Sequence, residues 1–223
     1  MRSDVLALFD LDHTLLTVDC DEAWVEFLIE QGAIDRATFE EGNRLVAERY
    51  RRGEVGLLEF TEFYLSTLIG QPLDRLTAWR ETYLRMKIIP AIPVASRALV
   101  ARHFADGHLC VLTTAASRFL AGPIGLDLGF EHMVATEPEV RDGAFTGKVS
   151  GLPNMRENKI ARLDAWLAGR ALKLRDFRQS WFYSDSRNDI PLLQEVTDPV
   201  AVNPDPALAA LAAEKRWPVL RIG

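Results

Sequence analysis

The chain is 223 residues long, which at about 150 residues per domain predicts one full domain plus about half of another. Hydrophobic residues make up 48% of it and charged residues 26%, values of an ordinary globular protein that exclude a mostly disordered chain. Its 26 basic and 32 acidic side chains give a net charge of −6, which argues against a nucleic-acid partner because binding to a phosphate backbone needs clustered Lys and Arg.

The first predicted element is a buried strand at residues 5–9. The segment Val-Leu-Ala-Leu-Phe is a continuous apolar run, as expected of a central strand in a parallel sheet that is covered on both faces. It ends in Asp10-Leu11-Asp12, so two carboxylates follow the predicted strand directly.

Helical patterns without a convincing strand occupy the next stretch, from about residue 21 to residue 86. Apolar residues recur there at helical spacing, as at Trp24, Phe27 and Leu28, and segments that contain Gly separate the predicted helices. This stretch lies between the first strand and the rest of the sheet. It therefore predicts a small helical lobe inserted into the main domain, which accounts for the extra half domain.

Strands and helices alternate in the remainder of the chain. The predicted strands share a short apolar core and lie at 109–112, around 130–135, and at 181–183, 199–202 and 218–220. The predicted helices share apolar residues at helical spacing and lie at 94–104, 160–167 and 206–213. Asp205 is the predicted N-cap of the last helix, and residues 141–144 form a predicted hairpin turn. The alternation predicts a doubly wound, parallel α/β sheet.

The two cysteines, Cys20 and Cys110, lie far apart in the sequence and have no metal-type spacing. We predict that both are buried free thiols in a reducing, cytoplasmic setting. No apolar run approaches the ~18 residues of a membrane span, so no membrane partner is expected. Acidic residues near the start of the chain argue against a signal peptide. The sequence leaves open whether the protein is a monomer or a homodimer.

Polar residues that follow the predicted strands form a candidate site, because ligands of an open α/β sheet bind beyond the carboxyl ends of its strands. The set contains carboxylates, hydroxyls and one ammonium: Asp10, Asp12, Thr14, Thr113, Thr114, Lys159, Asp185 and Asp189. Several carboxylates in one crevice need a cation, and all-oxygen ligands suit Mg²⁺. The lysine and the hydroxyls indicate a phosphate beside the metal. These residue types therefore predict metal-assisted phosphoryl transfer.

Four segments resemble the motifs of the haloacid dehalogenase (HAD) superfamily. Residues 9–15, Phe-Asp-Leu-Asp-His-Thr-Leu, resemble motif one, Asp-x-Asp-x-Thr, and residues 112–114 resemble motif two, a hydroxyl at the end of an apolar strand. Lys159 resembles the lysine of motif three, and residues 184–189 resemble motif four. The order of the motifs and their expected secondary structure also match, and the resemblance covers nearly the whole chain.

The helical insertion is similar to the cap of subfamily IB, which contains the phosphoserine phosphatases. The resemblance implies a doubly wound, Rossmann-like α/β core of residues 1–18 and 89–223, with an all-helical cap at residues 19–88. Below, "the cap" means residues 19–88. A helical cap that closes over a site excludes water and bulky esters, which favours a small phosphorylated metabolite over a phosphoprotein.

The resemblance also implies a role for each matching residue. Asp10 is the nucleophile that attacks phosphorus in line to form an aspartyl-phosphate. Asp12 protonates the leaving alcohol and then takes a proton from the hydrolytic water. The implied Mg²⁺ ligands are Asp10, the backbone carbonyl of Asp12, and Asp185, with Asp189 binding the metal directly or through another ligand.

Two hydroxyls, those of Thr113 and Thr114, are candidates for holding the phosphoryl oxygens together with Lys159. We prefer Thr114, because family members show a similar spacing from the motif-two hydroxyl to the Leu-Gly pair at 128–129. Asp19 lies where motif one runs into the cap. In phosphoserine phosphatases a carboxylate near this point meets the substrate amine, so Asp19 is the candidate residue for binding the substrate.

Two metabolites are the main candidate substrates. Phosphoserine carries an amine and a carboxylate, whereas histidinol phosphate carries an amine and an imidazole and no carboxylate. The Ser-Gly-Gly of phosphoserine phosphatases is replaced here by Thr-Ala-Ala at 114–116. Residues 113–124 and 156–167 look more like a neighbouring phosphoserine phosphatase-like bacterial branch, some members of which have been linked to histidinol phosphate. The expected substrate is therefore histidinol phosphate, with phosphoserine as the alternative.

Other functions fit the sequence less well. A sugar-phosphate phosphatase or a phosphomutase would share motif one. A phospho-accepting signalling module also uses a doubly wound sheet, an aspartyl-phosphate, a Thr and a Lys. Such receivers are about half as long, have no helical cap and accept phosphate on a later strand, so Asp10 after the first strand argues against this class.

Overall fold

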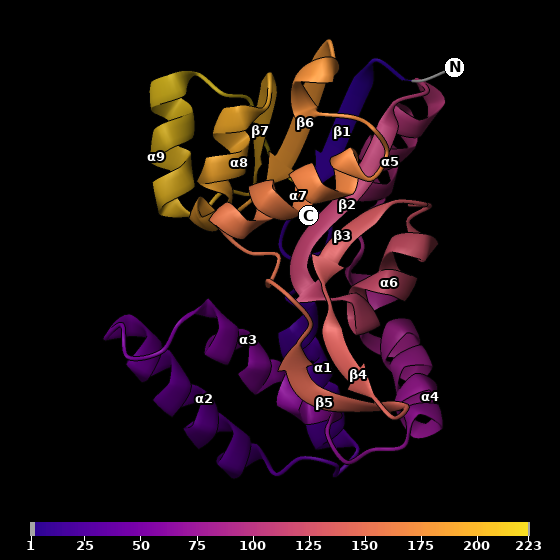
Figure 1. Ribbon diagram of the computed structural model, residues 1–223, viewed down its shortest axis with the longest axis vertical. Helices are drawn as coiled ribbons and strands as arrows, with labels where there is room; N and C mark the ends of the chain where they lie inside the picture. Colours follow the sequence, from indigo (N-terminus) through magenta and orange to yellow (C-terminus); the bar gives the residue numbers. More distant parts are fainter. Residues whose placement is uncertain (1–2, 223) are drawn as a thin grey trace.

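A six-stranded parallel sheet organises the protein. The computed structural model describes residues 3–222, and the strands lie in the order β3-β2-β1-β6-β7-β8, with every neighbouring pair parallel (Figure 1). The bounds of the strands are Val5–Phe9 (β1), Leu109–Ser117 (β2), Met133–Thr136 (β3), Gln179–Ser184 (β6), Asp198–Val202 (β7) and Val219–Leu220 (β8). The prediction of a doubly wound α/β sheet is confirmed.

Alternate residues of the strands build a separate hydrophobic core on each face of the sheet. From β1, Ala7 and Phe9 pack against α5 (Val94–Ala105) and α6 (Arg118–Asp127), whereas Leu6 and Leu8 pack against α7 (Glu157–Ala168), α8 (Ile190–Glu195) and α9 (Pro206–Lys215). All five residues of β1 are buried. The continuous apolar run of this strand therefore reflects its central place, with helices on both faces.

Three helices of the core agree with the prediction and two were missed. α5, α7 and α9 overlap the predicted ranges, and Asp205 caps α9 by accepting a hydrogen bond from the Leu208 N–H. α6 was missed because Pro123 and two glycines interrupt its apolar pattern. A Cβ atom on Gly125 would lie 2.5 Å from the Met133 side chain, so the small residue permits close packing on β3. α8 is too short to show a helical period.

The second strand is longer than predicted, which changes the position of two candidate residues. The prediction ended this strand at Leu112, with Thr113 and Thr114 beyond it, but β2 continues to Ser117. Both threonines therefore lie within the strand and are fully buried. Pairing with β3 shifts register between Thr114 and Ser117, so the strand bulges where it approaches the cap.

Among the described residues, helices are the only regular elements between β1 and the core helix α5. They are α1 (Cys20–Glu30), α2 (Arg36–Arg51), α3 (Leu57–Leu65) and α4 (Leu73–Tyr83), followed by short helical turns up to Ala91. At the junction with the core, the Thr17 N–H donates to the Ala91 carbonyl over 2.9 Å. The two crossings between core and cap are thus joined to each other. The exact division into core and cap stays a prediction.

The predicted hairpin is present and packs on the cap helices. β4 (Pro138–Arg141) and β5 (Ala144–Val149) pair antiparallel, with Asp142 and Gly143 at positive φ in the turn. Figure 1 shows the hairpin beside α1, α3 and α4, below the main sheet. Glu62 of α3 forms an ion pair with Lys148 at 2.7 Å. The hairpin thus extends from the core sequence into the helical lobe.

Cys20 and Cys110 are buried free thiols, as predicted. Within residues 3–222, none of the helices has both the length and the apolar character that crossing a membrane requires.

Candidate active site

Two carboxylates meet where β1 and β6 end. Asp10 follows β1, and its N–H donates to the Tyr183 carbonyl at 2.9 Å, which continues the ladder between the two strands. Asp185 follows β6. The Thr14 hydroxyl lies between the two side chains, 3.3 Å from Asp10 Oδ2 and 3.2 Å from Asp185 Oδ1. Because parallel neighbours end at the same edge, the strand order itself brings these carboxylates together.

A tight turn after β1 returns Thr14 to the strand end. The Leu11 carbonyl accepts hydrogen bonds from the N–H groups of Thr14, Leu15 and Leu16, at 2.8 to 3.3 Å. The turn is anchored in the core by three buried leucines, Leu11, Leu15 and Leu16. His13 adopts a φ of 54°, a left-handed conformation that His tolerates better than most residues. The turn thus sets the position of the hydroxyl that bridges the carboxylates.

Lys159 joins the first and last motifs. It lies in the first turn of α7 and is only 2% exposed. Its ammonium lies 2.8 Å from Asp10 Oδ1 and 2.6 Å from Asp189 Oδ2. Burial lowers the pKa of this ammonium, but the charges and hydrogen bonds of the two carboxylates outweigh burial and raise the pKa above its usual value. Lys159 is therefore a permanently charged donor directed at the nucleophile candidate.

Asp189 contacts Lys159 and Ser184 in the structure. Its Oδ2 accepts hydrogen bonds from the Lys159 ammonium and, at 2.8 Å, from the Ser184 hydroxyl. These two contacts orient Asp189 so that it holds Lys159 toward Asp10. Ser184 is the last residue of β6, and the sequence analysis did not assign it a part in the site.

Burial, helped by a neighbouring carboxylate in each case, raises the pKa of both carboxyls at the strand ends. Burial raises the pKa of Asp10 to about 6, although Lys159 opposes the shift. Burial and the charge of Asp10 raise the pKa of Asp185 to about 7. A single Thr14 hydroxyl supplies one hydrogen, so it cannot compensate both carboxylates. The pair therefore carries negative charge that a cation would stabilise.

The oxygen-only donors at this edge fit Mg²⁺. The two carboxylates of Asp10 and Asp185 and the backbone carbonyl of Asp12 are the kind of ligands that Mg²⁺ binds, along with water and phosphate. No three His, Cys, Asp or Glu side chains group closely enough for an all-side-chain metal site within residues 3–222. Two carboxylates and one backbone carbonyl are enough for Mg²⁺ without a third acidic side chain, because Mg²⁺ retains several waters as its other ligands.

Mg²⁺ is expected to raise the melting temperature more at pH 8 than at pH 5. A raised carboxyl pKa means that the folded protein binds more protons than the unfolded chain, so stability without metal falls as pH rises from the usual value of 3.8 toward about 7. Mg²⁺ at ~100 times its Kd should add roughly 5–10 °C at pH 8, and protons should compete with it at pH 5. Thermal melts with MgCl₂ and with EDTA measure this; equal shifts at both pH values would contradict it.

The two motif-two threonines make different contacts. The Thr113 hydroxyl accepts a hydrogen bond from the Asn154 side chain at 3.1 Å, whereas the Thr114 hydroxyl accepts one from the Ala116 N–H at 3.1 Å. Both hydroxyls accept one hydrogen bond, and within residues 3–222 neither donates its own hydrogen to another group, so these contacts do not distinguish the two candidates. Thr114 as the phosphate-binding hydroxyl stays a prediction.

Asp12 lies beside a cavity between the core and the cap. Its Oδ1 accepts a hydrogen bond from the Cys20 N–H at 2.8 Å, at the first residue of α1. Burial, and then the nearby charges of Asp19, Asp10 and Asp21, raise the pKa of Asp12 well above its usual value. The shift favours the protonated form of Asp12, which is the form that a general acid needs.

The cavity beside Asp12 has a volume of ≈150 Å³ and an acidic, partly aromatic lining. The acidic side chains come from the motif-one turn and α1, the aromatic ones from α3, and small residues from the end of β2. The lining consists of Asp12, Asp19, Asp21, Glu22, Phe60, Thr61, Tyr64, Leu65, Ala115, Ala116, Ser117 and Met155. Asp19 thus lies where the prediction expects a substrate-binding carboxylate, and it also caps α1 by accepting from the Glu22 N–H at 2.9 Å.

Glu22, Phe60 and Tyr64 also line this cavity and were not predicted from the sequence, whereas Asp21 lies with Asp19 where motif one runs into the cap. Asp21 and Glu22 follow Asp19 directly, and burial together with the charges of these neighbours raises the pKa of Asp21 to about 8. Phe60 and Tyr64 are one helical turn apart on α3. An i, i+4 aromatic pair is a visible signal, but the pattern alone does not reveal that this face of α3 lies over the strand ends.

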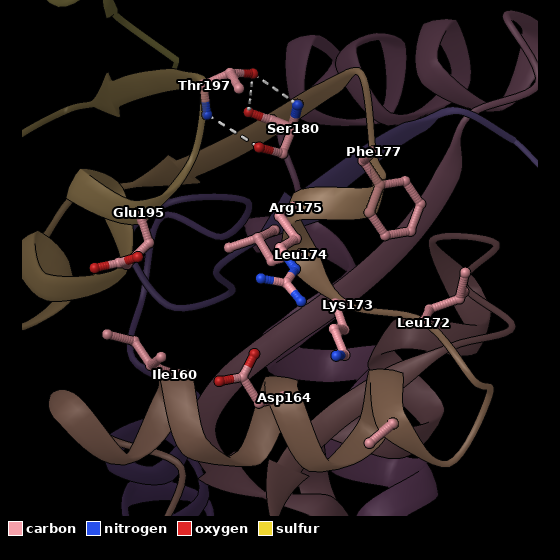
Figure 2. Close-up of a pocket in the computed structure, with 11 residues that line it drawn as sticks. Ile160, Asp164, Leu172, Lys173, Leu174, Arg175, Phe177, Ser180, Glu195 and Thr197 are labelled. Carbon is pink, nitrogen blue, oxygen red and sulfur yellow. Dashed lines mark hydrogen bonds between the residues drawn. The ribbon is translucent and has the colours of Figure 1, made fainter.

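A larger cavity of ≈660 Å³ lies elsewhere on the core. Figure 2 shows Ile160 and Asp164 of α7 on one side of it, and Leu174, Arg175 and Phe177 on the other. Its lining also includes Ser180 and Thr197, which are hydrogen-bonded to each other near the starts of β6 and β7. None of its lining residues belongs to the candidate site, and it lies toward the opposite edge of the sheet from Asp10.

Comparisons with known proteins agree with this geometry. A family model described as haloacid dehalogenase-like hydrolase matches residues 7–194. A histidinol-phosphatase of Neisseria meningitidis serogroup C (strain 8013) is 38% identical over 216 residues, covering 96% of this chain and 97% of that protein. A crystal structure of a protein with unknown function from Bordetella pertussis Tohama I is 44% identical, with a TM-score of 0.93 over 99% of each chain.

The fold also matches solved phosphoserine phosphatases. A structure described as a phospho-aspartyl intermediate analogue of phosphoserine phosphatase is 17% identical, with a TM-score of 0.66 over 99% of this chain and 94% of that chain. At this identity the likeness concerns the fold alone. It agrees with the predicted combination of a doubly wound sheet and an inserted helical lobe.

Proposed function

Because the chain belongs to the haloacid dehalogenase-like hydrolase family, we propose that it is a Mg²⁺-dependent phosphomonoesterase whose substrate is histidinol phosphate. Phosphatases of this family typically use Mg²⁺. The reaction proceeds through an aspartyl-phosphate on Asp10. The likeness to a histidinol-phosphatase over nearly the full length of both chains supports this choice of substrate.

The observation that carries the substrate assignment is the charge of the cavity beside Asp12. Four residues of the described lining are acidic, and that lining contains no Lys or Arg. Histidinol phosphate presents an amine and an imidazole, both of which carry or accept positive charge near neutral pH, and the aromatic rings of Phe60 and Tyr64 suit a flat heterocycle. The carboxylate of phosphoserine would instead face acidic groups, with no cationic partner in the described lining.

The chemistry divides among the residues at the strand ends. The Asp10 carboxylate attacks phosphorus, and the bond from phosphorus to the ester oxygen breaks as the new bond forms. Asp12 gives its proton to the leaving alkoxide, so the alcohol departs neutral. Asp12 then accepts a proton from water, which attacks phosphorus and releases inorganic phosphate and free Asp10. Lys159 and the Thr114 hydroxyl hold the phosphoryl oxygens while negative charge develops there.

The proposed metal site combines ligands from three residues with one orienting hydroxyl. Asp10 and Asp185 would ligate Mg²⁺ with the Asp12 carbonyl, and Thr14 orients the two carboxylates. When bound, Mg²⁺ would neutralise charge on the carboxylates and the phosphate. Asp189 keeps Lys159 directed at Asp10. We therefore propose that Asp189 positions the lysine, in addition to its predicted role of binding the metal directly or through another ligand.

The substrate assignment predicts a preference for histidinol phosphate in a phosphate-release assay. Its kcat/KM should exceed that of phosphoserine by roughly 10- to 200-fold, the range expected when one misplaced charge or group separates two ligands. The phosphomonoester p-nitrophenyl phosphate, whose alcohol part carries no charge, serves as a reference. A higher kcat/KM for phosphoserine would overturn the assignment of the substrate and leave the phosphatase class intact.

A charge-removing variant tests the same cavity. Asn is as good an N-cap as Asp, so Asp19→Asn keeps α1 capped and removes only a negative charge. KM for histidinol phosphate should rise roughly tenfold, with little change for p-nitrophenyl phosphate. Asp35→Asn is the matched control, since Asp35 caps α2 in the same way, accepting from the Thr38 N–H at 2.9 Å, and does not line the cavity.

A further inference from the structure

Asn154 connects three parts of the site from a buried loop position. It lies between β5 and α7, five residues before Lys159, and is fully buried. Its two Nδ2 hydrogens face three acceptors, the Thr114 and Val134 carbonyls, each at 2.9 Å, and the Thr113 hydroxyl oxygen at 3.1 Å, so one hydrogen is shared between two acceptors. Two carbonyl acceptors require a donor, so the amide orientation is fixed by its surroundings.

The Asn154 side chain occupies the place where β2 and β3 separate. Thr113 and Thr114 pair with β3, and the register then shifts before Ser117. At this bulge the carbonyls of Thr114 and Val134 turn toward the Asn154 amide. A buried carbonyl without a donor is costly, so the amide stabilises the separated strands. The bulged segment 114–117 carries the Thr114 hydroxyl and lines the substrate cavity.

The same residue fixes the start of the helix that carries Lys159. The Asn154 N–H donates to the Thr136 hydroxyl at 2.9 Å, which attaches the loop to the end of β3. Arg156 then adopts a φ of 52° and a ψ of −132°, and the Lys159 N–H closes the first turn on the Arg156 carbonyl at 3.0 Å. A strained residue beside a functional group persists only where its surroundings hold it. Asn154 provides such a fixed point two residues before the strain.

We propose that Asn154 is a positioning residue that sets the spacing between the Thr114 hydroxyl and the Lys159 ammonium, and so the binding of the phosphoryl group. The inference rests on the proposed phosphatase function. Asn154 touches no reacting atom. It acts through the bulged strand on one side and through the loop into α7 on the other.

The test compares phosphate binding with metal binding in Asn154→Ala. Calorimetry should show inorganic phosphate binding weakened roughly tenfold in the presence of Mg²⁺. The Mg²⁺ concentration for half-maximal thermal stabilisation should change less than about twofold, because the carboxylates of Asp10 and Asp185 make no contact with Asn154. With p-nitrophenyl phosphate, kcat should fall roughly 10- to 100-fold.

Asn203→Ala is the matched control for loss of a structural asparagine. The Asn203 side chain exchanges two hydrogen bonds with the backbone of Ile222, at 2.7 and 3.0 Å, and makes none with Thr114 or Lys159. This variant should lose stability and keep phosphate affinity. Unchanged phosphate affinity in a folded Asn154→Ala protein would overturn the inference, as would an equal loss of phosphate and Mg²⁺ affinity.

A second variant applies if Asn154→Ala does not fold. Thr136→Val removes the acceptor of the Asn154 N–H and leaves the carboxamide in place, so a smaller loss of phosphate affinity is expected; no loss there would also count against the inference. Absence of phosphatase activity in the unaltered protein would instead contradict the proposed function. The calorimetric comparison separates the two failures because it needs no turnover.

Discussion

Replacing Asp10 with Asn is expected to abolish phosphate release, with kcat lowered roughly 10⁴-fold or more. The amide has nearly the same size but cannot attack phosphorus. The Asp10 carboxylate also contributes to the raised pKa of Asp185, so the variant should lower the pKa of Asp185 from about 7. Steady-state assays with p-nitrophenyl phosphate in saturating Mg²⁺ measure the loss.

The same variant should fold well without metal. Asp189 still pairs with Lys159 at 2.6 Å, and one repulsive charge has been removed from the strand ends. The melting temperature in EDTA should therefore equal or exceed that of the parent, while the stabilisation by Mg²⁺ should largely disappear. Asp74→Asn, at an exposed position of α4, controls for a general effect of the substitution. Substantial activity in Asp10→Asn would remove Asp10 from the nucleophile role.

Replacing Lys159 with Met is expected to be costly for both stability and activity. The ammonium is the shared partner of two buried carboxylates, Asp10 and Asp189. Removing one partner of a buried ion pair costs about 3–5 kcal/mol, because it leaves an uncompensated buried charge. In the proposed mechanism the Lys159 ammonium donates to the phosphoryl oxygens, so its loss should also lower kcat by ~10²- to 10³-fold.

The stability loss in Lys159→Met should depend on pH in a definite direction. Without the ammonium the pKa of Asp10 rises further above about 6, so the folded state holds a proton there that the unfolded chain releases at lower pH. The loss should be largest at pH 8 and smaller at pH 5, where the carboxyl is protonated. Urea unfolding at both values measures this.

Lys148→Met provides the comparison for Lys159→Met. Lys148 forms an ion pair with Glu62 over a similar distance, 2.7 Å, but its side chain is 64% exposed. Exposed pairs contribute about 0–1 kcal/mol, so this variant should lie close to the parent. If the two lysine variants unfolded at the same urea concentration, the buried ammonium would not have the structural weight assigned to it.

The main features of the site could be predicted from the sequence because residues that directly follow neighbouring parallel strands lie close together, even when they are far apart in the chain. Asp10 and Asp185 lie far apart in the chain, yet both follow buried apolar strands, and parallel neighbours end at one edge. The meeting of Lys159 with Asp10 was expected from the motif order, and the structure brings the two together at 2.8 Å. Periodicity also predicted the helices of the insertion, whose apolar faces repeat regularly.

Features that depend on backbone irregularity were not predictable in this way. The contacts of Asn154 are to carbonyls exposed by a bulge, and no residue pattern marks where the ladder between β2 and β3 opens. For the same reason, the end of β2 was placed at Leu112 rather than at Ser117. The cap of α1 is different, because Asp19 followed three residues later by Glu22 is a recognisable start signal that went unused.

The hydrogen bond between Thr17 and Ala91 has a consequence for how this molecule tolerates change. It places the two ends of the inserted segment side by side, so the segment begins and ends at nearly one point of the core. From the viewpoint of the sheet, the insertion is a closed loop whose length hardly matters, since the entropy of closing a loop grows only slowly with its length. The core could therefore be rejoined there by a short linker, or given a different lobe, without redirecting a single strand. The carboxylates proposed to be catalytic and the lobe proposed to select the substrate are, in this sense, separately replaceable.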